Sequence, residues 1–151
     1  NEAETAQYFR KGDGWGWSGD LAVMDADGFI TLVGRSKEMI VSGGINIYPR
    51  EVEIVLENHP EVEDCTVFGV PDARWGEALI AYVVKRPGAH DGAEDGAHTD
   101  EDVLLAYCTE QLARYKRPRE FVFVSNIPKT PSGKIQKPLL RDAYLDGRVL
   151  P

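Results

Sequence analysis

The sequence predicts an α+β fold, in which helices cover a small central β-sheet and a separate β-hairpin stands apart from it. Short apolar, β-rich runs at 62–70, 78–85 and 121–124 indicate the strands of the sheet. Apolar residues at helical spacing lie before the first of these runs and between the second and the third, and an Asp-Gly pair near the N-terminus indicates a hairpin turn. A chain of 151 residues with 42% hydrophobic residues suits one domain with a modest core.

The N-terminal part of the chain contains the hairpin signal. Residues 1–20 have few apolar positions and four glycines, so we expect them to form no core of their own. Residues 23–33 predict a hairpin that turns at Asp27-Gly28. A short strand at 39–41 then turns back at 42–44 into a second strand at 45–47.

Two helices are predicted around the strands at 62–70 and 78–85. The first begins at Pro49, ends near Pro60 and places Val52, Val55 and Leu56 on one apolar face. The low-complexity stretch 87–98 reads as a mobile connection.

The second helix follows a weak capping box at 99–102. Leu105, Cys108 and Leu112 are its expected apolar face. After the strand at 121–124, Pro138 opens a short last helix.

Charge and cysteine usage narrow the classes of function. The net charge of −8 argues against nucleic acid as a partner, because nucleic-acid binding needs a basic face. Basic residues gather at 115–119 and near Lys134, which suits a small anionic ligand. Cys65 and Cys108 have no C-x-x-C spacing and predict core packing in a reducing, cytoplasmic compartment. No metal-ligand spacing is visible, and no run of about 18 apolar residues suggests a membrane span.

The stretch 128–137, with sequence PKTPSGKIQK, is the strongest local motif. Two prolines and Gly133 predict a shaped loop that presents Lys134 on its long stem. A compact ammonium of this kind suits a phosphate or carboxylate that develops charge during a reaction. The loop is no Walker motif, since Gly133-Lys134 is not followed by Ser or Thr. A solvated surface turn is the alternative.

Two further segments accompany this loop. They are 14–21, with sequence GWGWSGDL, and 34–53, with sequence GRSKEMIVSGGINIYPREVE. In this order and spacing, the three segments resemble the C-terminal part of the acyl-adenylate-forming superfamily, which includes acyl-CoA synthetases, peptide-synthetase adenylation domains and luciferases. Within it the chain looks like an AMP-forming ligase of a fatty acid or related carboxylic acid with CoA. The resemblance implies that residues 1–33 end an N-terminal adenylation domain and form its connecting hairpin. It also implies that residues 34–151 form a mobile C-terminal domain.

The resemblance implies roles for four residues on the adenylation side. Lys134 would contact the carboxylate and the ATP α-phosphate while the acyl-adenylate forms. Asp20 and Arg35 would bind the ribose of the nucleotide, the alternatives being a turn residue and a surface ion pair. Lys37 would occupy the hinge, where a solvated residue absorbs the change in backbone angles.

A second group would serve CoA. A glycine lacks a Cβ and lets the backbone approach a thin ligand such as phosphopantetheine. The resemblance places Ser42, Gly43, Gly44 and Trp75 along pantetheine, and Tyr115, Arg117 and Arg119 against the adenine and phosphates. Core anchoring is the alternative for the tryptophan, and an ordinary basic turn is the alternative for the last three residues.

The implied activity has two steps. A carboxylic acid reacts with ATP and Mg²⁺, both bound mainly by the N-terminal domain, and the acyl group then passes to CoA. One face cannot serve both steps, so the domain would reorient between them. Two other hypotheses stay open: an adenylation domain that loads a carrier protein, and a free-standing binding module.

Overall fold

The computed structural model describes residues 1–10, 12–88 and 100–148, and its elements confirm the α+β prediction. Residues 89–99, most of the expected mobile connection, lie outside the described part. The elements are α1 (Glu2–Tyr8), β1 (Asp20–Met24), β2 (Ile30–Arg35), β3 (Ile40–Ser42), β4 (Ile45–Ile47), α2 (Pro49–Glu57), β5 (Val62–Asp72), β6 (Gly76–Lys85), α3 (Asp100–Gln111), the 3₁₀ turn Arg114–Lys116, β7 (Glu120–Phe123) and α4 (Lys137–Leu145).

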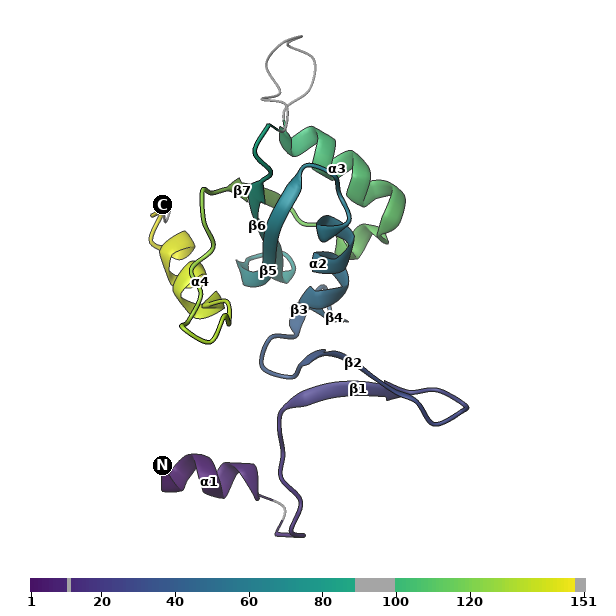
Figure 1. The fold of residues 1–151 in the computed structure, drawn as a ribbon, viewed down its shortest axis with the longest axis vertical. Helices are drawn as coiled ribbons and strands as arrows, with labels where there is room; N and C mark the ends of the chain where they lie inside the picture. Colours follow the sequence, from purple (N-terminus) through teal and green to yellow (C-terminus); the bar gives the residue numbers. More distant parts are fainter. Residues whose placement is uncertain (11, 89–99, 149–151) are drawn as a thin grey trace.

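The main sheet is organised around β6 (Figure 1). On one side β6 pairs along its whole length with β5, as a long antiparallel hairpin. On its other side β6 meets β3 at its beginning and the parallel strand β7 further along. The β3–β4 hairpin extends the sheet beyond this contact.

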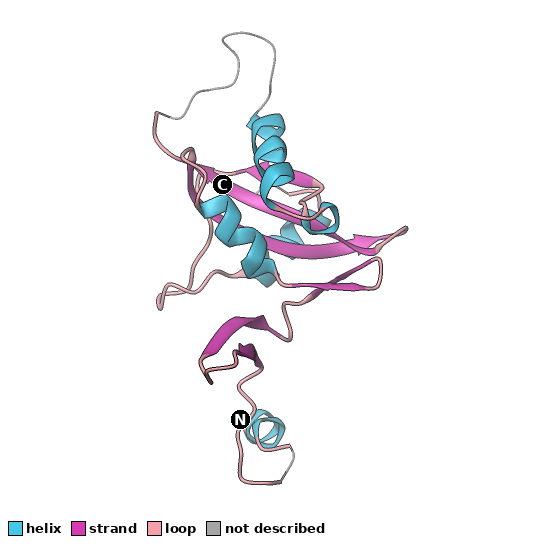
Figure 2. Cartoon of the chain, turned by 90° about the vertical axis from the view of Figure 1, so that its right-hand side faces the viewer, coloured by secondary structure: helices cyan, strands magenta, loops and turns pink. Residues whose placement is uncertain are grey.

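Helices cover both faces of the sheet, as Figure 2 shows. Alternate residues of β5 and β6, such as Val67 and Ala81, pack in a cluster with α2 and α3. Their neighbours, such as Phe68 and Tyr82, pack in a second cluster with Leu140 of α4. Strands that are buried on both faces read as continuous apolar runs, which is why these two were visible in the sequence.

The β1–β2 hairpin stands apart from the main sheet, as expected (Figure 1). The Asp25 carboxylate accepts hydrogen bonds from the backbone N–H groups of Asp27 and Phe29, at 3.0 and 2.9 Å. Gly28 adopts a positive φ of 85° in the same loop. The turn is therefore a longer connection than a two-residue Asp-Gly turn, although it lies at the predicted place.

The expected apolar face of α3 was wrong by one residue. Leu104 is 3% exposed and belongs to the core, whereas Leu105 is 41% exposed. Cys108 and Leu112 are buried as predicted. Leu104, Cys108 and Leu112 are spaced four residues apart and form one stripe, from which Leu105 is rotated by about 100°.

The N-terminal segment contains a helix that was not predicted. The Asn1 side chain accepts a hydrogen bond from the Ala3 N–H at the start of α1. The described side chains of this helix are exposed, which agrees with the expectation that residues 1–20 form no core. Across the described residues, every helix is too short or too polar to pass through a lipid bilayer.

Candidate functional site

The Lys134 loop closes on itself by local hydrogen bonds. The backbone N–H of Thr130 donates to the Lys134 carbonyl at 2.8 Å, and the Lys134 N–H donates to the Thr130 hydroxyl at 3.1 Å. Gly133 has a φ of 81°, which its missing Cβ makes inexpensive. The Lys134 side chain is exposed, and within the described residues it has no hydrogen-bond or ion-pair partner. The loop therefore presents an ammonium group that is free to meet an anion.

Both ends of this loop are attached to the rest of the domain. At its beginning, Ile127 is buried under α4, and the Lys129 ammonium lies 2.6 Å from the Asp64 carboxylate of β5. At its end, Lys137 forms ion pairs with Glu38 and Glu53. The sequence interpretation did not single out these ion pairs, because no local pattern links residues so far apart in the chain.

Asp20 and Arg35 are brought together. They face each other across the β1–β2 ladder, and the Arg35 Nε lies 3.1 Å from the Asp20 Oδ1. Both side chains remain partly exposed, so the carboxylate keeps acceptor sites that a pair of vicinal hydroxyls could use. The two residues thus form a surface ion pair, and the same arrangement still leaves room for a ribose at the Asp20 carboxylate.

A hollow of about 330 Å³ lies beside this pair. Its walls come from both sides of Lys37 in the sequence: Asp20, Leu32, Gly34 and Arg35 precede it, and Glu38, Pro49, Arg50, Glu53 and Lys137 follow it. Lys37 itself is exposed in the turn between β2 and β3. A rotation at this turn would change the shape of the hollow, because the turn joins its two walls.

The turn Ser42-Gly43-Gly44 packs against Trp75. Gly43 and Gly44 have φ values of 58° and 79°, and the Gly43 N–H donates to the Trp75 carbonyl at 2.8 Å. A Cβ on Gly43 would lie 3.0 Å from the Trp75 ring, whereas one on Gly44 would meet nothing within 4 Å. Trp75 Nε1 is buried and has no hydrogen-bond partner in the described part of the chain.

The loop that carries Trp75 is shaped by Asp72. Its carboxylate accepts hydrogen bonds from the N–H groups of Trp75 and Arg74, at 2.8 and 2.9 Å. These hydrogen bonds stabilise the charged form and lower the pKa of Asp72. The guanidinium groups of Arg74 and Arg119 lie 4.9 and 5.2 Å from the Trp75 ring centre. An aromatic ring with two guanidinium groups near it, next to a glycine turn, suits a thin ligand with phosphate groups.

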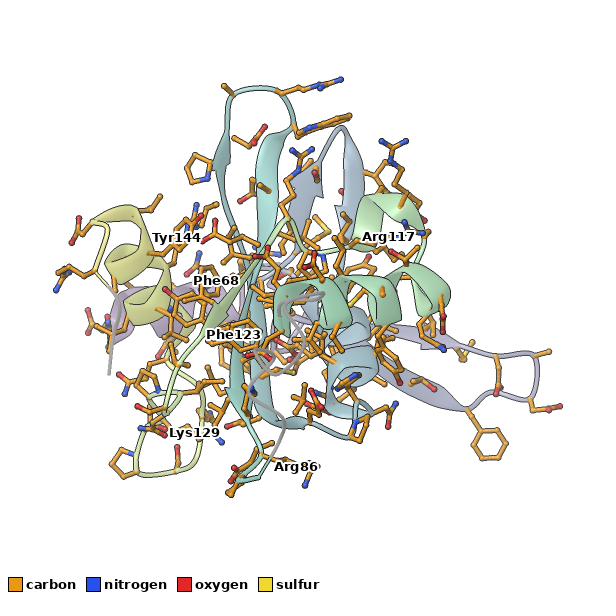
Figure 3. The ribbon with its side chains drawn as sticks, turned by 90° about the horizontal axis from the view of Figure 1, so that it is seen from above. Phe68, Arg86, Arg117, Phe123, Lys129 and Tyr144 are labelled. Carbon is orange, nitrogen blue, oxygen red and sulfur yellow. The ribbon has the colours of Figure 1, made fainter. Side chains whose placement is uncertain are left out.

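The predicted CoA residues are only partly brought together. Ser42, Gly43, Gly44, Trp75 and Arg119 form one group. Tyr115 is exposed beside Lys116. Arg117 instead donates hydrogen bonds to the carbonyls of Leu112 and Thr109, at 3.0 and 3.1 Å, and so satisfies the C-terminal end of α3. Figure 3 shows it beside α3, far from Tyr144 on α4. Arg74, which was not predicted, joins the group because it precedes Trp75 in the same loop.

The sequence of the chain matches a protein-family model. The model described as the AMP-binding enzyme C-terminal domain matches residues 51–134. The chain belongs to this family. As a member of the AMP-binding C-terminal family, it carries Lys134 at the end of the matched segment and Trp75 within it.

The chain is also similar, over most of its length, to parts of longer proteins. The chain is 48% identical over 140 residues to the feruloyl-CoA synthase of Amycolatopsis sp, covering 93% of this chain and 26% of that protein. It is 44% identical over 125 residues to the sulfoacetate–CoA ligase of Cupriavidus necator, covering 83% of this chain and 23% of that protein. The crystal structure of ATP-bound MatB from Rhodopseudomonas palustris matches with a TM-score of 0.80 and 35% identity, covering 98% of this chain and 28% of that one. The chain thus spans about a quarter of the length of the curated relatives it matches.

Proposed function

We propose that this chain is the C-terminal part of an AMP-forming ligase that joins a carboxylic acid to CoA. In this proposal residues 1–33 end the N-terminal adenylation domain and provide its connecting hairpin, and residues 34–151 form the mobile C-terminal domain. The observation that carries the proposal is the unpaired ammonium of Lys134, presented by an anchored loop in a member of the AMP-binding C-terminal family.

Lys134 would act in the first step. The carboxylate oxygen attacks the α-phosphorus of Mg-ATP, the bond to pyrophosphate breaks, and acyl-AMP forms. Negative charge grows on the phosphoryl oxygens and on the departing pyrophosphate. A fixed cation stabilises this charge more than it stabilises the reactants, which lowers the barrier. Asp20 would hold the ribose hydroxyls, with Arg35 fixing the carboxylate by their ion pair. The upstream part would bind most of Mg-ATP.

The glycine turn would act in the second step. The CoA thiolate attacks the acyl carbon of acyl-AMP, and AMP leaves. Pantetheine would pass along Gly43 and Trp75, and Arg74 and Arg119 would meet the phosphates. The Lys134 loop lies beside α4, whereas this turn lies at the end of the β3–β4 hairpin. The domain would therefore reorient at Lys37 between the steps.

The names of the relatives support a proposal for the acceptor and leave the acid open. Their names include a CoA synthase and a CoA ligase, which supports CoA over a carrier protein as the acceptor. The acids in these names, feruloyl and sulfoacetate, differ widely although the chain is similar to both proteins. We therefore propose a carboxylic acid, fatty or related, whose selection depends on residues outside this chain.

Lys134→Ala in the full-length enzyme tests the proposal. We expect ATP–pyrophosphate exchange to fall about 10²-fold, as on loss of one preorganised donor of charge stabilisation. Thioester formation from supplied acyl-AMP should be largely retained, because Lys134 is then turned away. Lys85→Ala is the control, since it shortens a lysine of the ion pair that ties β6 to α3. Equal losses in both half-reactions would contradict two separate faces, and no loss would remove Lys134 from catalysis.

A further inference from the structure

A charged cluster lies at the end of the Lys134 loop, three residues beyond the catalytic candidate. The Lys137 Nζ lies 2.8 Å from the Glu53 Oε1 and 3.0 Å from the Glu38 Oε2. The Lys137 side chain is 17% exposed and that of Glu53 only 9%, so this ion pair is largely withdrawn from water. Salt screens such a pair much less than an exposed one.

Glu53 is a fixed point of the core. Its carboxylate also accepts hydrogen bonds from the Val67 N–H at 3.0 Å and the Thr66 hydroxyl at 3.3 Å, both on β5. The Arg50 guanidinium lies 3.9 Å from its other oxygen. A carboxylate fixed between α2 and β5 in this way holds the ammonium of Lys137 at a defined place.

The Lys134 loop is therefore held at both ends, by Lys129 on Asp64 and by Lys137 on Glu53. Only two residues separate Lys134 from Lys137, so a displacement of the second moves the first. The hydrogen bonds between Thr130 and Lys134 keep the shape of the turn but do not attach it to the domain. Apolar contacts also hold the loop, since Ile127 is buried and Ile135, directly after Lys134, packs against the second cluster. The two ion pairs add polar anchors to these contacts, and the Lys137 pair is the one that lies on the far side of Lys134.

We propose that Lys137 is a positioning residue for Lys134 in the adenylation step. The proposal rests on the proposed function, in which Lys134 meets the developing charge. A displacement of about 1 Å at a reacting group can cost about 10²-fold in rate. Glu38 strengthens the arrangement, because it directly follows Lys37 and ties the end of the loop to the segment at which the domain would rotate.

The experiment compares Lys137→Met, Lys137→Arg, Lys134→Ala and the double variant Lys134→Ala/Lys137→Met in the full-length enzyme. We expect Lys137→Met to lower ATP–pyrophosphate exchange by about 10- to 100-fold. Thioester formation from supplied acyl-AMP should change by less than about twofold, and Lys137→Arg should restore most of the exchange rate. The double variant should be no slower than Lys134→Ala, because Lys137 acts through Lys134. Lys85→Met is the matched control, since Lys85 also forms a partly buried ion pair, with Asp100.

Three results would overturn the proposal. Multiplied losses in the double variant would show that Lys137 acts independently of Lys134. Equal losses in both half-reactions of a folded Lys137→Met protein would show a general structural role. Normal exchange in Lys137→Met, with a large loss in Lys134→Ala, would refute the positioning role and leave the proposed function intact. Normal exchange in Lys134→Ala would instead refute the proposed function itself.

A second variant covers the case in which Lys137→Met fails to fold, since it leaves Glu53 without its close cation. Glu38→Gln removes the more exposed partner of Lys137 and keeps the pair with Glu53. We expect it to lower pyrophosphate exchange by a smaller factor, about 2- to 10-fold, with thioester formation retained. Unchanged exchange in this variant would overturn the proposal in that case.

Discussion

Lys134 and Lys137 show how differently two lysines of one loop can be used. The ammonium of the first is exposed and has no partner within the described residues, whereas that of the second forms ion pairs with two carboxylates. Removing Lys134 leaves no buried charge behind, so its loss should lower the rate of the adenylation step and leave the stability of the fold unchanged. Removing Lys137 leaves Glu53 without its close cation, so its loss should be felt in both position and stability.

The two cysteines illustrate what burial does to a single side chain. Both are free and buried, as expected from their spacing. Burial in the core raises the pKa of the Cys65 thiol to about 12 and that of Cys108 to about 11. Each thiol thus keeps its proton near neutral pH and behaves as a small apolar side chain.

The adjacent leucines of α3 offer a residue-scale prediction. Leu104→Ala should lower the free energy of unfolding by about 2–5 kcal/mol, because it opens a cavity in the core. Leu105→Ala should cost less than about 1 kcal/mol, since the side chain is partly in water. Denaturant unfolding of both variants in the same background measures the difference. Equal losses would contradict the orientation of α3.

At the scale of elements, the turn between β3 and β4 has two glycines with the same kind of backbone and different surroundings. Both φ values are positive, so an alanine is strained at either position. Only a Cβ at Gly43 would press on the Trp75 ring. The pair therefore separates backbone strain from contact with the proposed pantetheine path.

We expect Gly43→Ala to slow thioester formation from supplied acyl-AMP more than Gly44→Ala does, by about 10-fold, because a displaced Trp75 disturbs the path of the ligand. Gly43→Leu should block that step more fully. ATP–pyrophosphate exchange should stay near normal in all three variants, measured in the full-length enzyme. Normal thioester formation in Gly43→Leu would remove this turn from the mechanism.

At the scale of the whole molecule, the described residues form a domain with its own core and a hairpin attached through the turn at Lys37. The hairpin exposes the large apolar side chains of Met24, Phe29, Ile30 and Leu32. The hollow beside Asp20 and Arg35 is lined by residues from both parts. In the proposed enzyme this hollow would form only the edge of the nucleotide site.

The chain alone should therefore bind ATP weakly or not at all. Isothermal titration calorimetry of the 151-residue chain should show no micromolar binding, whereas the full-length enzyme should bind Mg-ATP. The physical reason is that the ion pair of Asp20 and Arg35 is partly exposed and too few groups surround it. Micromolar binding by the chain alone would favour a free-standing binding module.

The sequence by itself determined the elements whose signals are local. Apolar runs predicted β5 and β6, because both faces of these strands are buried, and Pro49 and Pro138 indicated where two helices begin. The Gly43-Gly44 turn and the Lys134 loop were visible for the same reason, since their shape depends on neighbouring glycines and prolines. The pairing of Asp20 with Arg35 across the β1–β2 hairpin has no local signal. Both residues were nevertheless selected, because the resemblance implied a role for each.

Only the tertiary structure decided the contacts between distant segments. The choice between Leu104 and Leu105 depends on which side of α3 meets the sheet, and adjacent leucines give no local preference. The pairs of Lys137 with Glu53 and of Lys129 with Asp64 join residues more than sixty positions apart. The hydrogen bonds of Arg117 to the carbonyls of Leu112 and Thr109, at the end of α3, were likewise not visible in the sequence. Long-range pairing leaves no periodicity in a single sequence, because it depends on how completed elements pack against each other.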